Sequence, residues 1–256
     1  MKIGLCVFSQ NIERAAEAGY DYIQLPGFEM AEMTDDEFKN VAKRVEKCGI
    51  TVLGFNAYCT GRLPIVSDGF NEENTRKYAD LLLKRGCMLG VKNFGIGAPS
   101  ARKLPKEADV KKAWENGRRF LISTAEEAEK FGINVLVESL NKKCCDFITT
   151  LSESKKMVDE VNMKNVYMIV DFYHMEVNGE DYKTAVKYLP YTYDVHISGC
   201  GPKYERPFIN ESNMDELIKI SGILKDSGYN KTLSLEPDNW DFKKASESFK
   251  ILRETF

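Results

Sequence analysis

Histidine is scarce in this chain, with only two among 256 residues, His174 and His196. Multinuclear zinc sites that need several imidazole ligands are therefore excluded. The seven cysteines include no Cys-x-x-Cys pair, which argues against a structural zinc site of the usual spacing. Their number is odd, and the short apolar run at the N-terminus is followed by no cleavage pattern typical of export. We therefore expect reduced thiols in a cytoplasmic protein.

Long apolar runs and basic blocks are also missing. No stretch of about 18 apolar residues occurs, so the sequence predicts no membrane-spanning helix. A formal net charge of −3, from 36 Lys and Arg against 39 Asp and Glu, gives no general attraction to phosphate backbones. Nucleic acid is thus an unfavoured partner. The expected partner is a small polar molecule, and a homo-oligomer is left open.

Short apolar runs rich in β-branched and aromatic residues alternate along the chain with longer segments of helical periodicity. The pattern predicts eight strands and a helix after each of them. Such alternation at a spacing of roughly 30 residues is typical of a (β/α)8 TIM barrel, and we expect one domain over residues 1–256. The predicted strands are Lys2–Phe8, Asp21–Leu25, Ile50–Phe55, Val91–Ile96, Ile133–Glu138, Val166–Asp171, Tyr193–Ser198 and Thr232–Glu236.

The main rival is an open, doubly wound sheet. That fold usually has fewer strands and a glycine-rich first turn between strand and helix, and the first turn here, Phe8–Gln10, has no glycine. The Gly-x-Gly at Gly95 and Gly97 lacks the third glycine of a dinucleotide fingerprint and is interpreted as a tight turn. The closed barrel is therefore the favoured architecture.

Four polar residues stand at the ends of consecutive predicted strands, namely Glu138, Asp171, His196 and Glu236. In a barrel these positions meet at the mouth, where active sites lie. Three carboxylates together would repel one another without a cation, and with one imidazole they suit Mn²⁺, Mg²⁺, Co²⁺ or Zn²⁺. Any one of them alone is as well explained as a helix cap or an ion-pair partner. As a group they predict a metal site.

Short motifs follow several of the predicted strands. They are Val137-Glu138-Ser139-Leu140-Asn141, Phe147-Ile148-Thr149-Thr150, Asp171-Phe172-Tyr173-His174-Met175, Val195-His196-Ile197, Ser234-Leu235-Glu236, Asn56 and the segment Gly95–Arg102. Together they resemble the xylose isomerase-like superfamily of TIM barrels. The chain is most similar to the superfamily's sugar isomerase and epimerase branch, which includes ketose 3-epimerases and hydroxypyruvate isomerase. The likeness covers essentially the full chain.

This resemblance implies that Glu138, Asp171, His196 and Glu236 bind one divalent metal, usually Mn²⁺. It further implies that Glu138 and Glu236 are the acid/base groups and that His174 contacts a substrate hydroxyl or carbonyl. The chemistry agrees, because a cation stabilises the enediolate left when a proton is removed beside a carbonyl. Return of the proton to the other face inverts the carbon, and return to the adjacent carbon interchanges aldose and ketose.

Other residues at the predicted mouth are candidates for holding a carbohydrate substrate. Besides His174, they are Arg206, Arg102, Asn56 and Trp240. All but Asn56 have a plainer interpretation: a packing or supporting histidine, solvated loop arginines, and a tryptophan that packs on the top of the barrel.

The departures from the family pattern concern the grip on the substrate. The second glutamate of the 3-epimerases, six residues after the strand-five glutamate, is replaced by Cys144. Gln24 occupies the place near the end of strand two where a glutamate is usual. The arginine expected six residues after the strand-seven histidine is absent, and the nearest one is Arg206. A standard free ketose is therefore in question as the substrate.

The leading hypothesis is a metal-dependent isomerase or epimerase of a sugar or sugar derivative. A lyase or dehydratase on the same scaffold is the first alternative, as in the inosose and dehydroshikimate dehydratases or the C-glycoside-cleaving members of the superfamily. A carbohydrate-binding or partner subunit without catalysis is the second. The DNA-repair endonucleases of this fold fit poorly, because their trinuclear zinc site needs more histidines than the chain has.

Overall fold

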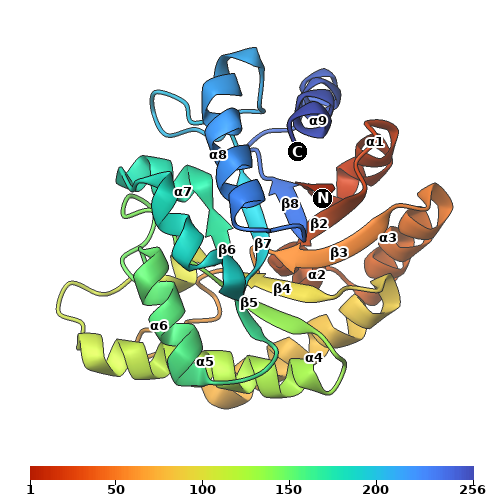
Figure 1. Ribbon diagram of the computed structural model, residues 1–256. Helices are drawn as coiled ribbons and strands as arrows, with labels where there is room; N and C mark the ends of the chain where they lie inside the picture. Colours follow the sequence, from red (N-terminus) through yellow and green to blue (C-terminus); the bar gives the residue numbers. More distant parts are fainter.

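The computed structural model describes residues 1–256 and shows a closed barrel of eight parallel strands. The strands follow one another around the barrel in sequence order, and β8 pairs with β1 to close it (Figure 1). The predicted (β/α)8 fold is confirmed. The strands are β1 (Lys2–Cys6), β2 (Tyr22–Pro26), β3 (Thr51–Asn56), β4 (Asn93–Ile96), β5 (Asn134–Glu138), β6 (Val166–Asp171), β7 (Thr192–Ile197) and β8 (Thr232–Leu235).

Helices surround the barrel, and none combines the length and apolar character needed to cross a bilayer (Figure 1). Thr34 begins α3 with a capping box that it forms with Glu37, and Gly49 ends the helix in a left-handed conformation. The α-helices are α1 (Ile12–Glu17), α2 (Gly27–Glu32), α3 (Asp35–Cys48), α4 (Glu72–Leu89), α5 (Val110–Glu129), α6 (Leu151–Val161), α7 (Phe172–Asn178), α8 (Met214–Asp226) and α9 (Phe242–Thr255).

Two of these helices, α2 and α7, are not expected from the sequence pattern, since they start directly at the end of a strand. Pro26 and Gly27 look like a turn, yet they begin α2. Asp171 ends β6 and also caps α7, because its side chain accepts hydrogen bonds from the backbone N–H groups of Tyr173 and His174. Helical periodicity in the sequence also predicts a short helix over Tyr182–Leu189, and the structure has a 3₁₀ helix over Tyr182–Lys187 there.

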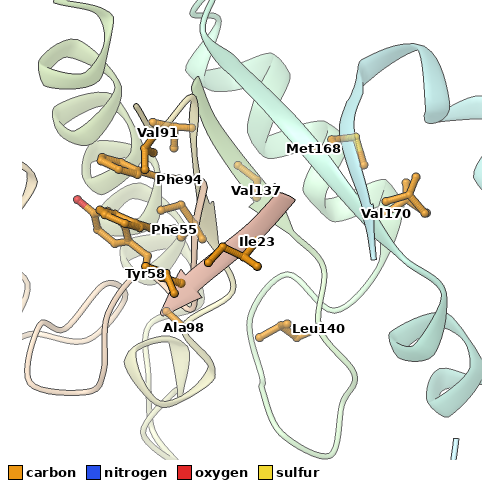
Figure 2. Close-up of a cluster of buried hydrophobic side chains, with 14 of the residues drawn as sticks. Ile23, Phe55, Tyr58, Val91, Phe94, Ala98, Val137, Leu140, Met168 and Val170 are labelled. Carbon is orange, nitrogen blue, oxygen red and sulfur yellow. The ribbon is translucent and has the colours of Figure 1, made fainter. Parts of the chain in front are cut away.

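The apolar core lies between the outer face of the barrel and the helices. Phe55 of β3 and Phe94 of β4 stack with ring centroids 5.8 Å apart, and Tyr58 lies against Phe94 at 5.5 Å (Figure 2). All three are fully buried. Burial of this aromatic cluster stabilises the side of the barrel that α4 covers.

The inside of the barrel, in contrast, holds a polar layer beneath the C-terminal mouth. Gln24, Asn93, Asp194 and Ser234 are all completely buried. Gln24 Nε2 donates to Asp194 Oδ2 at 2.7 Å and to Ser234 Oγ at 2.7 Å. Buried polar groups of this kind need partners, and here they link β2, β7 and β8 across the barrel.

The lower end of the barrel leaves no room for a side chain at Gly4. An added Cβ would lie 2.0 Å from the ring of Tyr22, whose hydroxyl is hydrogen-bonded to Ser234. We expect Gly4→Ala to destabilise the fold by about 1–3 kcal/mol through overpacking. Gly222→Ala in α8 is the control, because nothing lies within 4 Å of its added Cβ, and it should stabilise by about 0.5–1 kcal/mol. Urea unfolding midpoints measure both, and equal midpoints would contradict the packing argument.

Candidate active site

Four side chains from consecutive strands meet at the mouth of the barrel. Glu138 ends β5, Asp171 ends β6, His196 lies in β7, and Glu236 follows β8. One donor atom from each lies within 4.8 Å of the others. Glu138, Asp171 and His196 are buried, and Glu236 is partly buried. The structure therefore brings together the four residues that the strand ends single out.

These residues fit a single divalent cation. Two oxygen or nitrogen donors that bind one cation at about 2.0–2.6 Å lie no more than roughly 5.2 Å apart, and the four donors satisfy this limit. Glu138 Oε1 is buried and has no hydrogen-bond partner, and its nearest cationic neighbour is His196 Nδ1 at 3.5 Å. An unpaired, buried carboxylate oxygen is costly unless a cation binds it.

His196 is oriented by carboxylates on both sides of its ring. Its Nε2 lies 3.2 Å from Asp194 Oδ2, and its Nδ1 lies 3.2 Å from Glu236 Oε2. Burial alone would lower the pKa of His196, but the neighbouring carboxylates of Asp194, Glu138 and Glu236 outweigh it and raise that pKa well above its usual value. With Nε2–H held by Asp194, the ring presents Nδ1 to the carboxylates.

Arg206 is the cation that contacts this group directly. It comes from the loop between β7 and α8, and its Nη2 lies 2.7 Å from Asp171 Oδ2 and 2.7 Å from Glu236 Oε2. Its side chain is buried to all but 12%, so it is not the solvated loop arginine of the plainer interpretation. Although burial raises the pKa values of Asp171 and Glu236, the charge of Arg206 brings both below their usual range.

His174 lies one turn into α7 and faces Asp171. The backbone N–H of Asn141 donates to its Nδ1 at 3.2 Å, and its Nε2 is 3.7 Å from Asp171 Oδ2. Burial lowers the pKa of His174, with Asp171 opposing the shift only in part. The ring is therefore neutral near pH 7 and carries its proton on Nε2, the atom on the Asp171 side.

The other predicted substrate residues lie in two different settings. Asn56 Nδ2 donates to Glu236 Oε1 at 2.9 Å from the end of β3, and Trp240 packs against Phe208. Both line the mouth cavity. Arg102 does not line that cavity: it is 2% exposed, and its Nη1 donates to the backbone oxygen of Glu138 at 2.9 Å. This hydrogen bond of Arg102 stabilises the backbone at the end of β5.

The mouth cavity has a volume of about 220 Å³ and runs from Glu236 toward the ends of β1 and β2. Both apolar and polar side chains line it, as is usual for sites that bind small molecules. Arg206 is the only cationic side chain among its lining residues. These residues are Cys6, Val7, Phe8, Asn11, Pro26, Phe28, Asn56, Ala57, Arg206, Glu236, Pro237, Asp238, Asn239 and Trp240.

Comparison with known proteins identifies the family. The family described as xylose isomerase-like TIM barrel matches residues 12–255. The chain belongs to this family. Among curated relatives, it is 25% identical over 237 residues to a D-psicose 3-epimerase of Ruminiclostridium cellulolyticum, covering 90% of this chain and 78% of that protein. It is also 28% identical to a putative hydroxypyruvate isomerase of Streptomyces coelicolor, covering 73% and 68%.

Solved structures show the same xylose isomerase-like fold. A D-allulose 3-epimerase from Methylomonas sp. in complex with D-allulose superposes with a TM-score of 0.84 at 17% identity, covering 100% of this chain and 97% of that one. A D-psicose 3-epimerase from Clostridium cellulolyticum H10 superposes with a TM-score of 0.81 at 22% identity, covering 100% and 99%. At these identities the likeness establishes the barrel and its order of strands.

Three further residues lie at the centre of this xylose isomerase-like barrel and are not among the four polar residues at the strand ends. Asp194, Gln24 and Cys6 lie on β7, β2 and β1 and contact or adjoin His196 and Glu236. Strand periodicity offers a signal for one of them: Asp194 is two residues before His196, so both side chains point to the same face. A charged residue inside an otherwise apolar run then indicates a partner within the barrel.

Arg206 should carry much of the stability of the mouth when no divalent cation is present. Arg206→Gln leaves Asp171 and Glu236 facing each other without a guanidinium, so we expect a loss of about 3–5 kcal/mol in the presence of a chelator. Urea unfolding with EDTA measures this loss. Arg62→Gln is the control, because Arg62 pairs with Glu32 on the surface and should change stability by less than about 1 kcal/mol.

Proposed function

We propose that this protein is a sugar epimerase or isomerase that moves a proton on a carbon next to a carbonyl and depends on a divalent cation. The observation that carries the proposal is the convergence of Glu138, Asp171, His196 and Glu236 within 4.8 Å at the mouth of the barrel. The similarity to proteins named D-psicose 3-epimerase and L-ribulose 3-epimerase supports the reaction class. The ketose 3-epimerases are metal-dependent.

The four residues would hold the cation, with Mn²⁺ preferred over Mg²⁺, Co²⁺ or Zn²⁺ because three of the four donors are carboxylates. When bound, it would offset the negative charge that develops on substrate oxygens as the proton leaves the neighbouring carbon. A substrate that presents a carbonyl and an adjacent hydroxyl suits this chemistry. Such a unit occurs in ketoses and their derivatives.

Glu138 and Glu236 are the groups we assign to proton transfer. They approach the mouth from β5 and from the end of β8, so a substrate between them has one carboxylate toward each face. One glutamate takes the proton from the carbon and the other returns a proton to the opposite face, which inverts the centre. Asn56 keeps Glu236 oriented through its hydrogen bond to Oε1.

His174 and Trp240 are assigned to binding of the sugar. The neutral imidazole of His174 carries its proton on Nε2, which can donate to a substrate hydroxyl or carbonyl oxygen. Trp240 lines the mouth cavity, and its ring suits the C–H face of a sugar. Together they orient the reacting carbon toward the two glutamates.

Solvent isotope exchange tests the reaction. Incubation with Mn²⁺ and a panel of ketoses in ²H₂O should place deuterium beside the carbonyl of the epimerised or isomerised sugar. Glu138→Gln and Glu236→Gln should each lower the rate by about 10²–10⁴-fold, because each removes one proton-transfer group. Glu211→Gln, on an exposed residue outside the mouth, is the control. Full exchange in both active-site variants would contradict the assignment, and an unsaturated product would indicate a lyase.

Asp194 should control how tightly the cation is bound, because it holds the Nε2 side of His196. We expect Asp194→Asn to weaken Mn²⁺ binding about 10–100-fold, as is usual when the partner of a metal-binding histidine is lost. The electron paramagnetic resonance signal of free Mn²⁺ measures this affinity directly. Asp215→Asn, on the exposed surface of α8, is the control and should bind Mn²⁺ like the unchanged protein.

A further inference from the structure

Cys6 has a position that the proposed reaction does not use. It ends β1, which is hydrogen-bonded to β8 at the seam where the barrel closes, and Leu5 pairs with Leu235. This register places Cys6 beside Glu236 at the mouth. The residue is 7% exposed and lines the mouth cavity.

The sulfur of Cys6 completes a second set of possible ligands. Cys6 Sγ, one nitrogen of His196 and one carboxylate oxygen of Glu236 all lie within 4.8 Å of one another. No hydrogen bond to another group engages the thiol, so its sulfur faces the other two donors without a competing partner. Glu138 and Asp171 belong to the other set and are not part of this one.

The two sets differ in chemical character. Three carboxylates and one imidazole suit a hard cation such as Mn²⁺ or Mg²⁺. One thiolate, one imidazole and one carboxylate suit Zn²⁺ or Co²⁺, which accept sulfur, nitrogen and oxygen together and keep a further position open. Because His196 and Glu236 occur in both sets, one cation in the thiol set excludes a cation from the carboxylate set.

We propose that Cys6, His196 and Glu236 form a second, thiolate-containing metal site that takes Zn²⁺ or Co²⁺ in competition with the carboxylate site. The inference rests on the proposed function only in that His196 and Glu236 are shared. The thiol proton passes to solvent as the sulfur binds the cation, so the step involves no change in oxidation state. Zn²⁺ held on the Cys6 side is withdrawn from Glu138 and Asp171, and Zn²⁺ therefore inhibits the Mn²⁺-dependent reaction.

Co²⁺ is the probe that separates the two sites. A thiolate bound to Co²⁺ gives a charge-transfer absorption in the near ultraviolet, whereas carboxylate and imidazole ligands give none. We expect this band in the unchanged protein and in Cys59→Ser, a control on a cysteine that is likewise buried, and its loss in Cys6→Ser. Circular dichroism and the thermal midpoint establish that each variant is folded.

Zn²⁺ affinity provides the second readout, measured by competition with a chromophoric chelator. Cys6→Ser should weaken Zn²⁺ binding about tenfold or more, while Mn²⁺ binding stays within about twofold of the unchanged protein. Zn²⁺ inhibition of the exchange reaction should weaken in parallel. A variant that loses Mn²⁺ binding to the same extent as Zn²⁺ binding would overturn the proposal of a separate site.

The outcomes distinguish this inference from the proposed function. Mn²⁺ binding without any thiolate band for Co²⁺ overturns the Cys6 site and leaves the carboxylate site standing. A thiolate band that persists in Cys6→Ser also overturns it. A band that depends on Cys6, in a protein that binds no Mn²⁺, supports the Cys6 site and contradicts the Mn²⁺-dependent function.

Discussion

Repulsion among three closely spaced carboxylates is the constraint on which the mouth of this barrel depends. Glu138, Asp171 and Glu236 bring donor atoms within 4.8 Å of one another, and burial of the first two limits the screening of their charges by water. Two side chains offset this charge within the chain: Arg206 pairs with Asp171 and Glu236, and His196 lies between Glu138 and Glu236. These two groups do not fully offset three carboxylates, because one oxygen of Glu138 remains without a hydrogen-bond partner. The site therefore still attracts a further cation.

Closure of the barrel supplies the geometry, and the polar layer beneath the mouth preserves it. Parallel pairing in sequence order brings the ends of β5 to β8 side by side. The carboxylate of Asp194 accepts from Gln24 and Ser234 and holds His196 from below, so the ring cannot rotate without leaving buried groups unpaired. The buried polar layer thereby fixes the orientation of His196, the one imidazole among the four candidate ligands.

The sequence predicts the barrel and the polar residues at its strand ends because both depend on local patterns. These patterns are apolar runs, helix caps and a polar residue where a run stops. It does not predict what depends on contacts between distant segments. Cys6 becomes part of the site only when β1 pairs with β8, and Gln24 matters only because β2 faces β7 across the barrel. Arg102 and Arg206 are both loop arginines in the sequence, but the fold buries Arg102 against the end of β5 and places Arg206 on the carboxylates.

The loop that carries Arg206 holds its guanidinium against the carboxylates of Asp171 and Glu236. Tyr204 adopts a left-handed conformation at φ 65, and the hydroxyl of Tyr173 donates to its backbone oxygen. The guanidinium of Arg206 then lies 4.5 Å from the centre of the Tyr173 ring and points at Asp171 and Glu236. If this arginine turned toward a substrate oxygen, it would withdraw positive charge from two of the carboxylates that we propose as metal ligands. Under the proposed function, substrate binding through Arg206 and cation binding at the mouth would therefore be coupled, with each strengthening the other.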